Sequence, residues 1–257
     1  MISQLTQSLN GHTSTVRCIE FVDATTAVSA SRDGDLRIWN LKTGACEGTL
    51  SGHRDTTFTL AITGMYAISG SKDGTARVWS LSEQREMSIL SGHSGAVRSV
   101  ATDGEKVVTG GLDTDVRVWE LTPGDSLAVL KGHTAMVNHI IIDRDLIFTG
   151  SAGGGIIVWS LRDYTTQYTI SKAHEGSVSS LDIWGEHMLS GGSDGRVKLW
   201  NSETAEYLGD IGTQTQVVWG VCLGRAKGQK VAIVASAQGT SRFPKHDDAF
   251  LDVSFLS

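Results

Sequence analysis

The chain has 257 residues, which is long for an ordinary single domain but typical of one closed all-β domain. Hydrophobic residues make up 40% of it, enough for a sizeable core, and 30 glycines against only 2 prolines favour short strands and tight turns. The formal net charge of −6 excludes a general nucleic-acid surface, because binding to a phosphate backbone needs clustered positive charge.

Two markers recur along the chain with a period of about 40 residues, the length of a WD repeat. A Gly-His pair opens each of the first four units, an Ala-His pair opens the fifth, and a tryptophan closes all five. The markers are His12, His53, His93, His133 and His174, with Trp39, Trp79, Trp119, Trp159 and Trp200. Because two independent markers keep one period, the sequence predicts a repeat fold.

Each unit contains four short strand patterns. In the first unit they cover Val16–Phe21, Ala27–Ser31, Leu36–Leu41 and Cys46–Leu50, with the tight turn Asp33-Gly34 between the second and third. One such sheet cannot bury both of its faces, whereas sheets packed around an axis cover each other. The sequence therefore predicts an all-β WD40 β-propeller.

A sixth unit lacks both markers but keeps three strand patterns, at Val217–Leu223, Val231–Ser236 and Phe250–Phe255. The segment Gln4–Leu9 has the pattern of a lone outer strand, and we expect it to complete the last sheet and remove a free edge. The prediction is one propeller of six four-stranded sheets over residues 1–257. Its units span about 11–51, 52–91, 92–131, 132–172, 173–211 and 212–257.

Other classes of protein lack support in the sequence. The cysteines Cys18, Cys46 and Cys222 are scattered and have no metal or disulfide spacing, and the remaining histidines have no ligand partner in register. Residues 1–10 do not resemble a signal peptide, and no apolar run reaches the length of a membrane span. We expect a protein of the nucleus or cytoplasm that needs no metal or other cofactor and contacts no membrane.

A His, a Ser or Thr, an Asp and a Trp recur at fixed offsets. A serine hydrolase would use such residues as a catalytic triad, but it needs one nucleophile beside a pocket, whereas this set repeats. We therefore predict no catalytic residue and a buried chain of hydrogen bonds in each unit. The four complete sets are His12, Ser29, Asp33 and Trp39; His53, Ser69, Asp73 and Trp79; His93, Thr109, Asp113 and Trp119; and His174, Ser190, Asp194 and Trp200.

The fourth unit departs from this pattern. It keeps His133, Thr149 and Trp159, but Gly153 stands where the other units have Asp. Its histidine loses an acceptor, and we predict a weaker and more mobile sheet there.

Propellers usually bind partners at the mouth of the ring. Two positions of each repeat are expected to place their side chains there. The position five after the histidine gives Arg17, Phe58, Arg98 and, in the sixth unit, Trp219, and the position before the turn Asp gives Arg32 and Lys72. Arginines beside aromatic side chains suit a phosphorylated peptide, because guanidinium groups bind phosphate oxygens in pairs. The alternative is that these are ordinary solvated charges.

Several segments resemble the F-box/WD-repeat proteins, the substrate receptors of SCF ubiquitin ligases. The resemblance rests on the segments Gly11–Cys18, Ser31–Trp39, Ser190–Trp200, Val217–Trp219 and Phe250–Phe255. It implies a propeller mouth whose arginines read phosphorylated Ser/Thr-Pro segments of target proteins, with Arg17 and Arg32 matching two of these arginines and Trp219 matching an aromatic beside the peptide.

Two departures qualify this resemblance. Phe58 stands where the family has its next arginine, and Arg98 is the candidate to replace it. No helical segment precedes Asn10, so the F-box that docks the ligase core is absent from this chain. The competing interpretation is a general WD-repeat scaffold that assembles a complex without reading phosphate.

Overall fold

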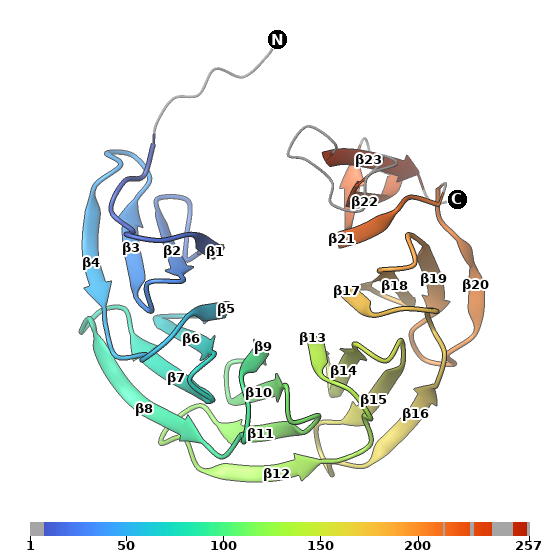
Figure 1. The fold of residues 1–257 in the computed structure, drawn as a ribbon, viewed down its shortest axis with the longest axis horizontal. Coiled ribbons are helices and arrows are strands. Elements are labelled where there is room, and N and C mark those ends of the chain that lie inside the picture. The colour runs from blue at the N-terminus through green and yellow to red at the C-terminus, as the bar shows by residue number, and fades with distance from the viewer. Residues whose placement is uncertain (1–7, 213, 227–228, 238–248, 256–257) are drawn as a thin grey trace. The chain divides into compact units, whose positions relative to one another are not determined.

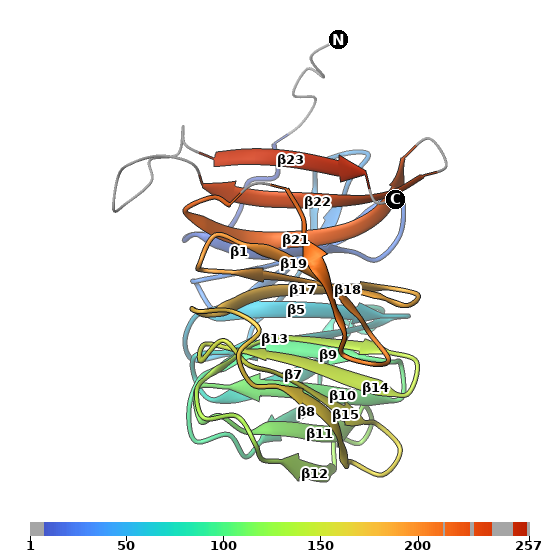
Figure 2. The ribbon, with the colours of Figure 1, turned by 90° about the vertical axis from the view of Figure 1, so that its right-hand side faces the viewer.

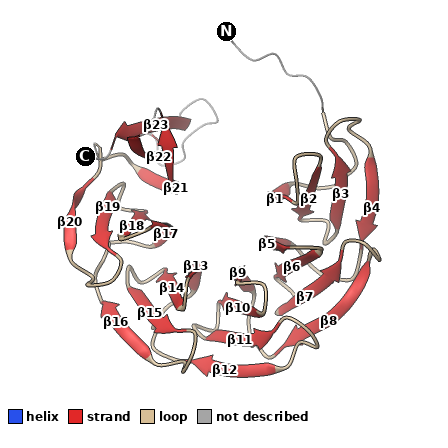
Figure 3. Cartoon of the chain, turned by 180° about the vertical axis from the view of Figure 1, so that it is seen from behind, coloured by secondary structure: helices blue, strands red, loops and turns tan. Residues whose placement is uncertain are grey.

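The computed structural model describes residues 8–212, 214–226, 229–237 and 249–255. These residues form strands, turns and loops and contain no helix, as Figure 3 shows. The strands form six antiparallel sheets, which fall into two compact units, residues 1–129 and 130–257. Each unit is described by itself below.

The first unit holds three sheets of four strands each, joined in chain order from the first strand to the fourth. In Figure 1 the first strands of these sheets, β1, β5 and β9, lie along one side of the unit, and the fourth strands lie along the other. The strands are β1 Val16–Phe21, β2 Thr26–Ser31, β3 Leu36–Asn40, β4 Cys46–Leu50, β5 Thr57–Thr63, β6 Tyr66–Ser71, β7 Thr75–Ser80, β8 Arg85–Ser91, β9 Val97–Thr102, β10 Lys106–Gly111, β11 Val116–Glu120 and β12 Ser126–Leu130.

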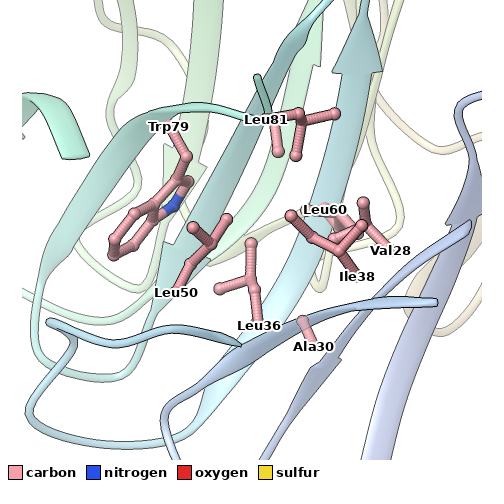
Figure 4. Packing of buried hydrophobic residues seen from close by; sticks show 9 residues of the cluster. Val28, Ala30, Leu36, Ile38, Leu50, Leu60, Trp79 and Leu81 are labelled. Atoms are coloured by element: carbon pink, nitrogen blue, oxygen red, sulfur yellow. The ribbon is translucent and has the colours of Figure 1, made fainter. Parts of the chain in front are cut away.

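The core of this unit lies between successive sheets. Val28, Leu36 and Leu50 of the first sheet pack against Leu60 and Trp79 of the second, as Figure 4 shows. A second cluster joins the second sheet to the third in the same way. Each sheet has apolar side chains on both faces, so stacking is what removes them from water.

The second unit has two four-stranded sheets and a third sheet of three strands. Figure 2 shows β21, β22 and β23 side by side in that last sheet. Apolar clusters again join consecutive sheets: Met188 and Trp200 pack with Phe148, and Val218 and Val221 pack with Leu189. The strands are β13 Val137–Asp143, β14 Leu146–Ser151, β15 Ile156–Ser160, β16 Thr166–Ile170, β17 Val178–Trp184, β18 His187–Gly192, β19 Val197–Asn201, β20 Tyr207–Asp210, β21 Val217–Ala226, β22 Gln229–Ala237 and β23 Ala249–Phe255.

The predicted strand patterns are confirmed in the first and sixth units, with bounds that differ by a few residues at most. The predicted closing strand at residues 4–9 falls mainly on residues 1–7, which lie outside the described residues. Of the six sheets predicted to have four strands, five have four and the last has three within the described part of the chain. Completion of that sheet by the N-terminal segment stays a prediction.

Candidate protein-binding site

A β-bulge interrupts the first strand of every sheet at the same place. The pairing of β1 with β2 shifts between Val16 and Cys18, so Arg17 has no partner in the ladder. The same shift in β5 leaves Phe58 unpaired, and the one between β9 and β10 leaves Arg98 unpaired. A bulge turns the extra side chain out of the regular alternation, which explains how one sequence offset presents one side chain per sheet.

Three of these bulged side chains meet in the first unit. The guanidinium carbon of Arg98 lies 4.2 Å from the ring centre of Phe58, and that of Arg17 lies 5.9 Å from the same ring centre. Arg17 is exposed, whereas Phe58 and Arg98 are half-buried. Burial, together with the positive charge of Arg17, lowers the pKa of Arg98. The structure thus brings two cations onto one aromatic ring.

Arg32 lies at the same end of the first sheet as Arg17. Its backbone amide donates to the carbonyl of Thr15, two residues before the bulge, and its side chain is exposed. Lys72 occupies the equivalent position in the second sheet, but its Nζ lies 3.1 Å from Oδ2 of Asp55. Part of the charge of Lys72 is therefore neutralised by Asp55, a partner that the repeat pattern does not predict.

The equivalent bulges of the second unit carry uncharged residues, Asn138, Ser179 and Trp219. Asn138 donates to the hydroxyl of Ser177, and Ser179 donates to the carbonyl of Val218, so both side chains are used within the unit. Trp219 is 48% exposed, which leaves a large apolar surface open to a partner. The positive charge at these positions belongs to the first unit.

Each complete His, Ser or Thr, Asp and Trp set forms a chain of hydrogen bonds. In the first, Trp39 Nε1 donates to Ser29 Oγ over 2.7 Å, Ser29 Oγ lies 2.7 Å from His12 Nε2, and His12 Nδ1 lies 2.9 Å from Asp33 Oδ2. The other three complete sets have the same connections, with distances of 2.7 to 3.1 Å. These residues therefore bind one another, and the side chains of the four histidines are at most 4% exposed.

The pKa shifts indicate which groups in these hydrogen-bonded sets carry a proton. Burial lowers the pKa of His53, His93 and His174, and the opposing effect of each Asp partner does not cancel it. Burial also raises the pKa of Asp33, but hydrogen bonds from His12 and from backbone amides outweigh it and bring the pKa to about 2. At neutral pH the imidazoles of His53, His93 and His174 are thus neutral, donate from Nδ1 to a carboxylate and accept the hydroxyl proton at Nε2.

The fourth set keeps only part of this chain. His133 Nε2 lies 2.7 Å from Thr149 Oγ1, which accepts from Trp159 Nε1 over 3.0 Å, while Gly153 offers no carboxylate to the other ring nitrogen. His133 is 9% exposed, and burial lowers its pKa to about 4. Weaker packing and greater mobility of this sheet stay a prediction.

We expect Asp73→Ala to lower the free energy of unfolding by about 1–3 kcal/mol, because each buried donor that loses its acceptor costs about that much. The carboxylate accepts from His53 Nδ1, from the Arg54 amide over 3.0 Å and from the Thr75 amide over 2.9 Å. Urea unfolding followed by tryptophan fluorescence measures the loss. Lys72→Ala is the control, because it removes only an exposed ion pair, which is worth at most about 1 kcal/mol. Equal losses in both variants contradict a structural role for the network.

No group of His, Cys, Asp and Glu within the described residues could hold a metal ion. Among the same residues, no helix is long and apolar enough to cross a membrane.

Comparisons with known proteins agree with the repeat. The family described as "WD domain, G-beta repeat" matches residues 3–40, 44–80, 84–120, 124–160 and 165–201. Among curated proteins, the pre-mRNA-splicing factor PRP46 of Eremothecium gossypii is 39% identical over 62 residues, which are 23% of this chain and 15% of that protein. The chain thus matches only a small part of that relative's length.

Solved structures extend the similarity to most of the chain. The computationally designed Ika8 protein superposes with a TM-score of 0.81 and 27% identity over 91% of this chain and 72% of its own. The structure of U3-55K superposes with a TM-score of 0.77 and 22% identity over 89% of this chain and 76% of its own. Five matched repeats cover well over half of the sequence. The chain therefore belongs to the WD domain, G-beta repeat family, an all-β family of the β-propeller class whose members generally serve as platforms for binding other proteins.

Proposed function

We propose that this chain is a protein-binding platform whose first unit recognises a phosphorylated Ser/Thr-Pro segment, as the substrate-recognition part of an SCF-type ubiquitin ligase receptor. One observation carries the proposal. Arg17 and Arg98 meet at the ring of Phe58, Arg32 lies at the same end of the first sheet as Arg17, and no ion pair with a described carboxylate is found for any of the three. The resemblance to F-box/WD-repeat proteins supports phosphorylated Ser/Thr-Pro segments as the class of target.

The chemistry of these arginines favours phosphate as the recognised group. The chain as a whole is acidic, with a net charge of −6, so two adjacent guanidiniums that no described carboxylate neutralises need a local reason. A guanidinium binds phosphate oxygens through two parallel hydrogen bonds, which is stronger and more directional than a single ammonium contact. A phosphorylated side chain supplies the missing negative charge without a permanent acidic partner in the protein.

The test is a titration of the full chain with paired phosphorylated and unphosphorylated Ser/Thr-Pro peptides. We expect binding that requires the phosphate and that falls about 10- to 100-fold in Arg17→Ala and in Arg32→Ala, since a charged hydrogen bond contributes about 1.5–3 kcal/mol. Lys42→Ala is the matched control, because it removes one exposed cation from the turn between β3 and β4. Equal affinity for both peptides overturns phosphate recognition.

A scaffold that assembles a complex without reading phosphate is the second candidate. Two observations support it: the exposed Trp219 at a bulge position of the second unit, and the similarity of a 62-residue segment to a splicing factor. That similarity also makes the nucleus the first place to look for the protein. Under this alternative, Trp219→Ala weakens partner binding and Arg17→Ala does not.

A further inference from the structure

The side chain at position 58 is the centre of the arginine cluster. The residues at this bulge position in the neighbouring sheets, Arg17 and Arg98, both direct their guanidiniums to the Phe58 ring, at 5.9 and 4.2 Å from its centre. Arginine faces an aromatic ring because the negative face of the ring attracts the cation. Phe58 is therefore in contact with the two groups that would hold an anion.

Arg98 is the more constrained of the two arginines. Its side chain is half-buried, its Nε is fully buried, and that Nε has no hydrogen-bond partner in the described part of the chain. The nearby positive charge of Arg17 also lowers the pKa of Arg98, because like charges repel. A protein gains nothing from a desolvated guanidinium next to a like charge unless a ring or an anion compensates. The ring of Phe58 supplies part of this compensation, and an anion bound between the two guanidiniums would add to it.

Resting on the proposed function, we infer that Phe58 is a positioning residue that holds the guanidiniums of Arg17 and Arg98 around one phosphate dianion. Arg98 thereby supplies the charge that position 58 does not carry. The ring fixes both cations before the ligand arrives, so less side-chain freedom is lost on binding. The recognised group is a phosphomonoester dianion, whose two charges and three terminal oxygens match two guanidiniums better than the single charge and two oxygens of a carboxylate do.

A site with two guanidiniums is expected to bind a phosphate dianion more tightly than a carboxylate. A peptide with Glu in place of the phosphorylated residue offers one negative charge and a planar group, so we expect it to bind at least about 10-fold more weakly than the phosphorylated peptide. Inorganic phosphate carries the same dianion without the peptide. It is therefore expected to compete with the phosphorylated peptide and to perturb the NMR signals of the Arg17 and Arg98 side chains.

The experiment compares Phe58→Leu with Phe58→Tyr in the full chain. Leucine keeps an apolar side chain but has no aromatic face, and we expect the affinity for the phosphorylated peptide to fall about 5- to 30-fold. Tyrosine restores the ring, and we expect affinity within about 3-fold of the unaltered chain. We expect inorganic phosphate to stop perturbing the NMR signals of Arg17 and Arg98 in Phe58→Leu but not in Phe58→Tyr. A general loosening of β5 would not distinguish the two variants in this way. Arg98→Ala provides a second variant in case Phe58→Leu does not fold, and is expected to weaken binding as much as Arg17→Ala.

The outcomes separate this inference from the proposed function. If phosphate-dependent peptide binding needs Arg17 and Arg32 but survives both Phe58→Leu and Arg98→Ala, the role of Phe58 is overturned while the proposed function stands. If inorganic phosphate binds at Arg17 and Arg98 and is lost in Phe58→Leu, yet phosphorylated and unphosphorylated peptides bind equally, the anion site stands and the peptide function fails. Equal loss of affinity in Phe58→Leu and Phe58→Tyr also overturns the role of the ring.

Discussion

We expect Gly195→Ala to destabilise the second unit by about 2–5 kcal/mol, more than a change of one methyl group costs at most positions. Gly195 follows Asp194 in the turn between β18 and β19 and has a φ angle of 77°, where a side chain costs about 1–2 kcal/mol. A Cβ atom at this position would also overlap the carbonyl oxygen of Thr215, whose amide donates to the carbonyl of Gly195 over 2.8 Å. Backbone cannot move aside as a flexible side chain can, so the overlap adds about 1–3 kcal/mol.

Gly185→Ala is the matched control in the same unit. Gly185 lies in the turn between β17 and β18 with a φ angle of 63°, and a Cβ there meets no atom within 4 Å. It therefore isolates the cost of the backbone conformation, about 1–2 kcal/mol. Urea unfolding of the two variants gives the difference. Similar losses in both would show that contact between this turn and Thr215 does not constrain the unit.

The repeat made most of the fold predictable, because each sheet obeys the same local rules. Period-two apolar patterns and Asp-Gly turns located the strands, and the Trp and His markers set their order. The glycine of the Gly-His pair has a physical reason that the sequence alone does not supply. A Cβ at Gly52 would lie 2.7 Å from the guanidinium of Arg77 and 3.1 Å from the ring of Trp79.

The fifth unit shows how the same constraint changes with its neighbours. Ala173 replaces the glycine there, and Lys198 replaces the arginine and donates to the carbonyl of Ala173 over 2.6 Å. The slimmer lysine makes room for the methyl group that the guanidinium excludes. Such coupled changes lie 25 residues apart and become interpretable only when the structure brings them together.

The candidate site was less predictable, because it depends on where bulges direct side chains. Counting five residues from each histidine located Arg17, Phe58 and Arg98 in sequence, but Phe58 there signified only a missing arginine. The ring contacts give it a partner on each neighbouring sheet. Conversely, the sequence predicts a free charge at Lys72, whereas the structure pairs Lys72 with Asp55. Pairing across strands follows from register, and register is not visible in composition or period.

Gly153→Asp is expected to stabilise the second unit by about 1–3 kcal/mol at neutral pH, since it restores the acceptor that the fourth set lacks. The position has room: a Cβ there lies 3.4 Å from Ala135 Cβ, an ordinary contact, and Gly153 has no positive φ angle. In the other sets the carboxylate accepts both from His Nδ1 and from the amide of the next residue, as Asp33 does from His12 and Thr13. The introduced carboxylate would do the same for His133 and Thr134.

The pH dependence gives this prediction a second, independent readout. The pKa of His133 is about 4 in the folded chain against an ordinary value of 6.5, so the unfolded chain binds the proton more tightly. Its contribution to stability is complete above pH 6.5 and declines as the pH falls to 4, by about 3 kcal/mol at 1.36 kcal/mol per pKa unit. A carboxylate beside the ring raises the pKa of His133 and removes part of this loss.

Gly153→Ala is the control that separates the network from the loss of glycine, which by itself stabilises by about 0.4–1 kcal/mol. The stability difference between Gly153→Asp and Gly153→Ala is therefore the quantity to follow. We expect it to be positive at pH 7 and to grow as the pH falls towards 5, because a protonated imidazole binds a carboxylate more strongly than a neutral one does. A difference that stays at zero across this range would mean that His133 gains nothing from an acceptor. In that case the carboxylates of the four complete sets stabilise their turns, through the backbone amides they accept from, and not their histidines.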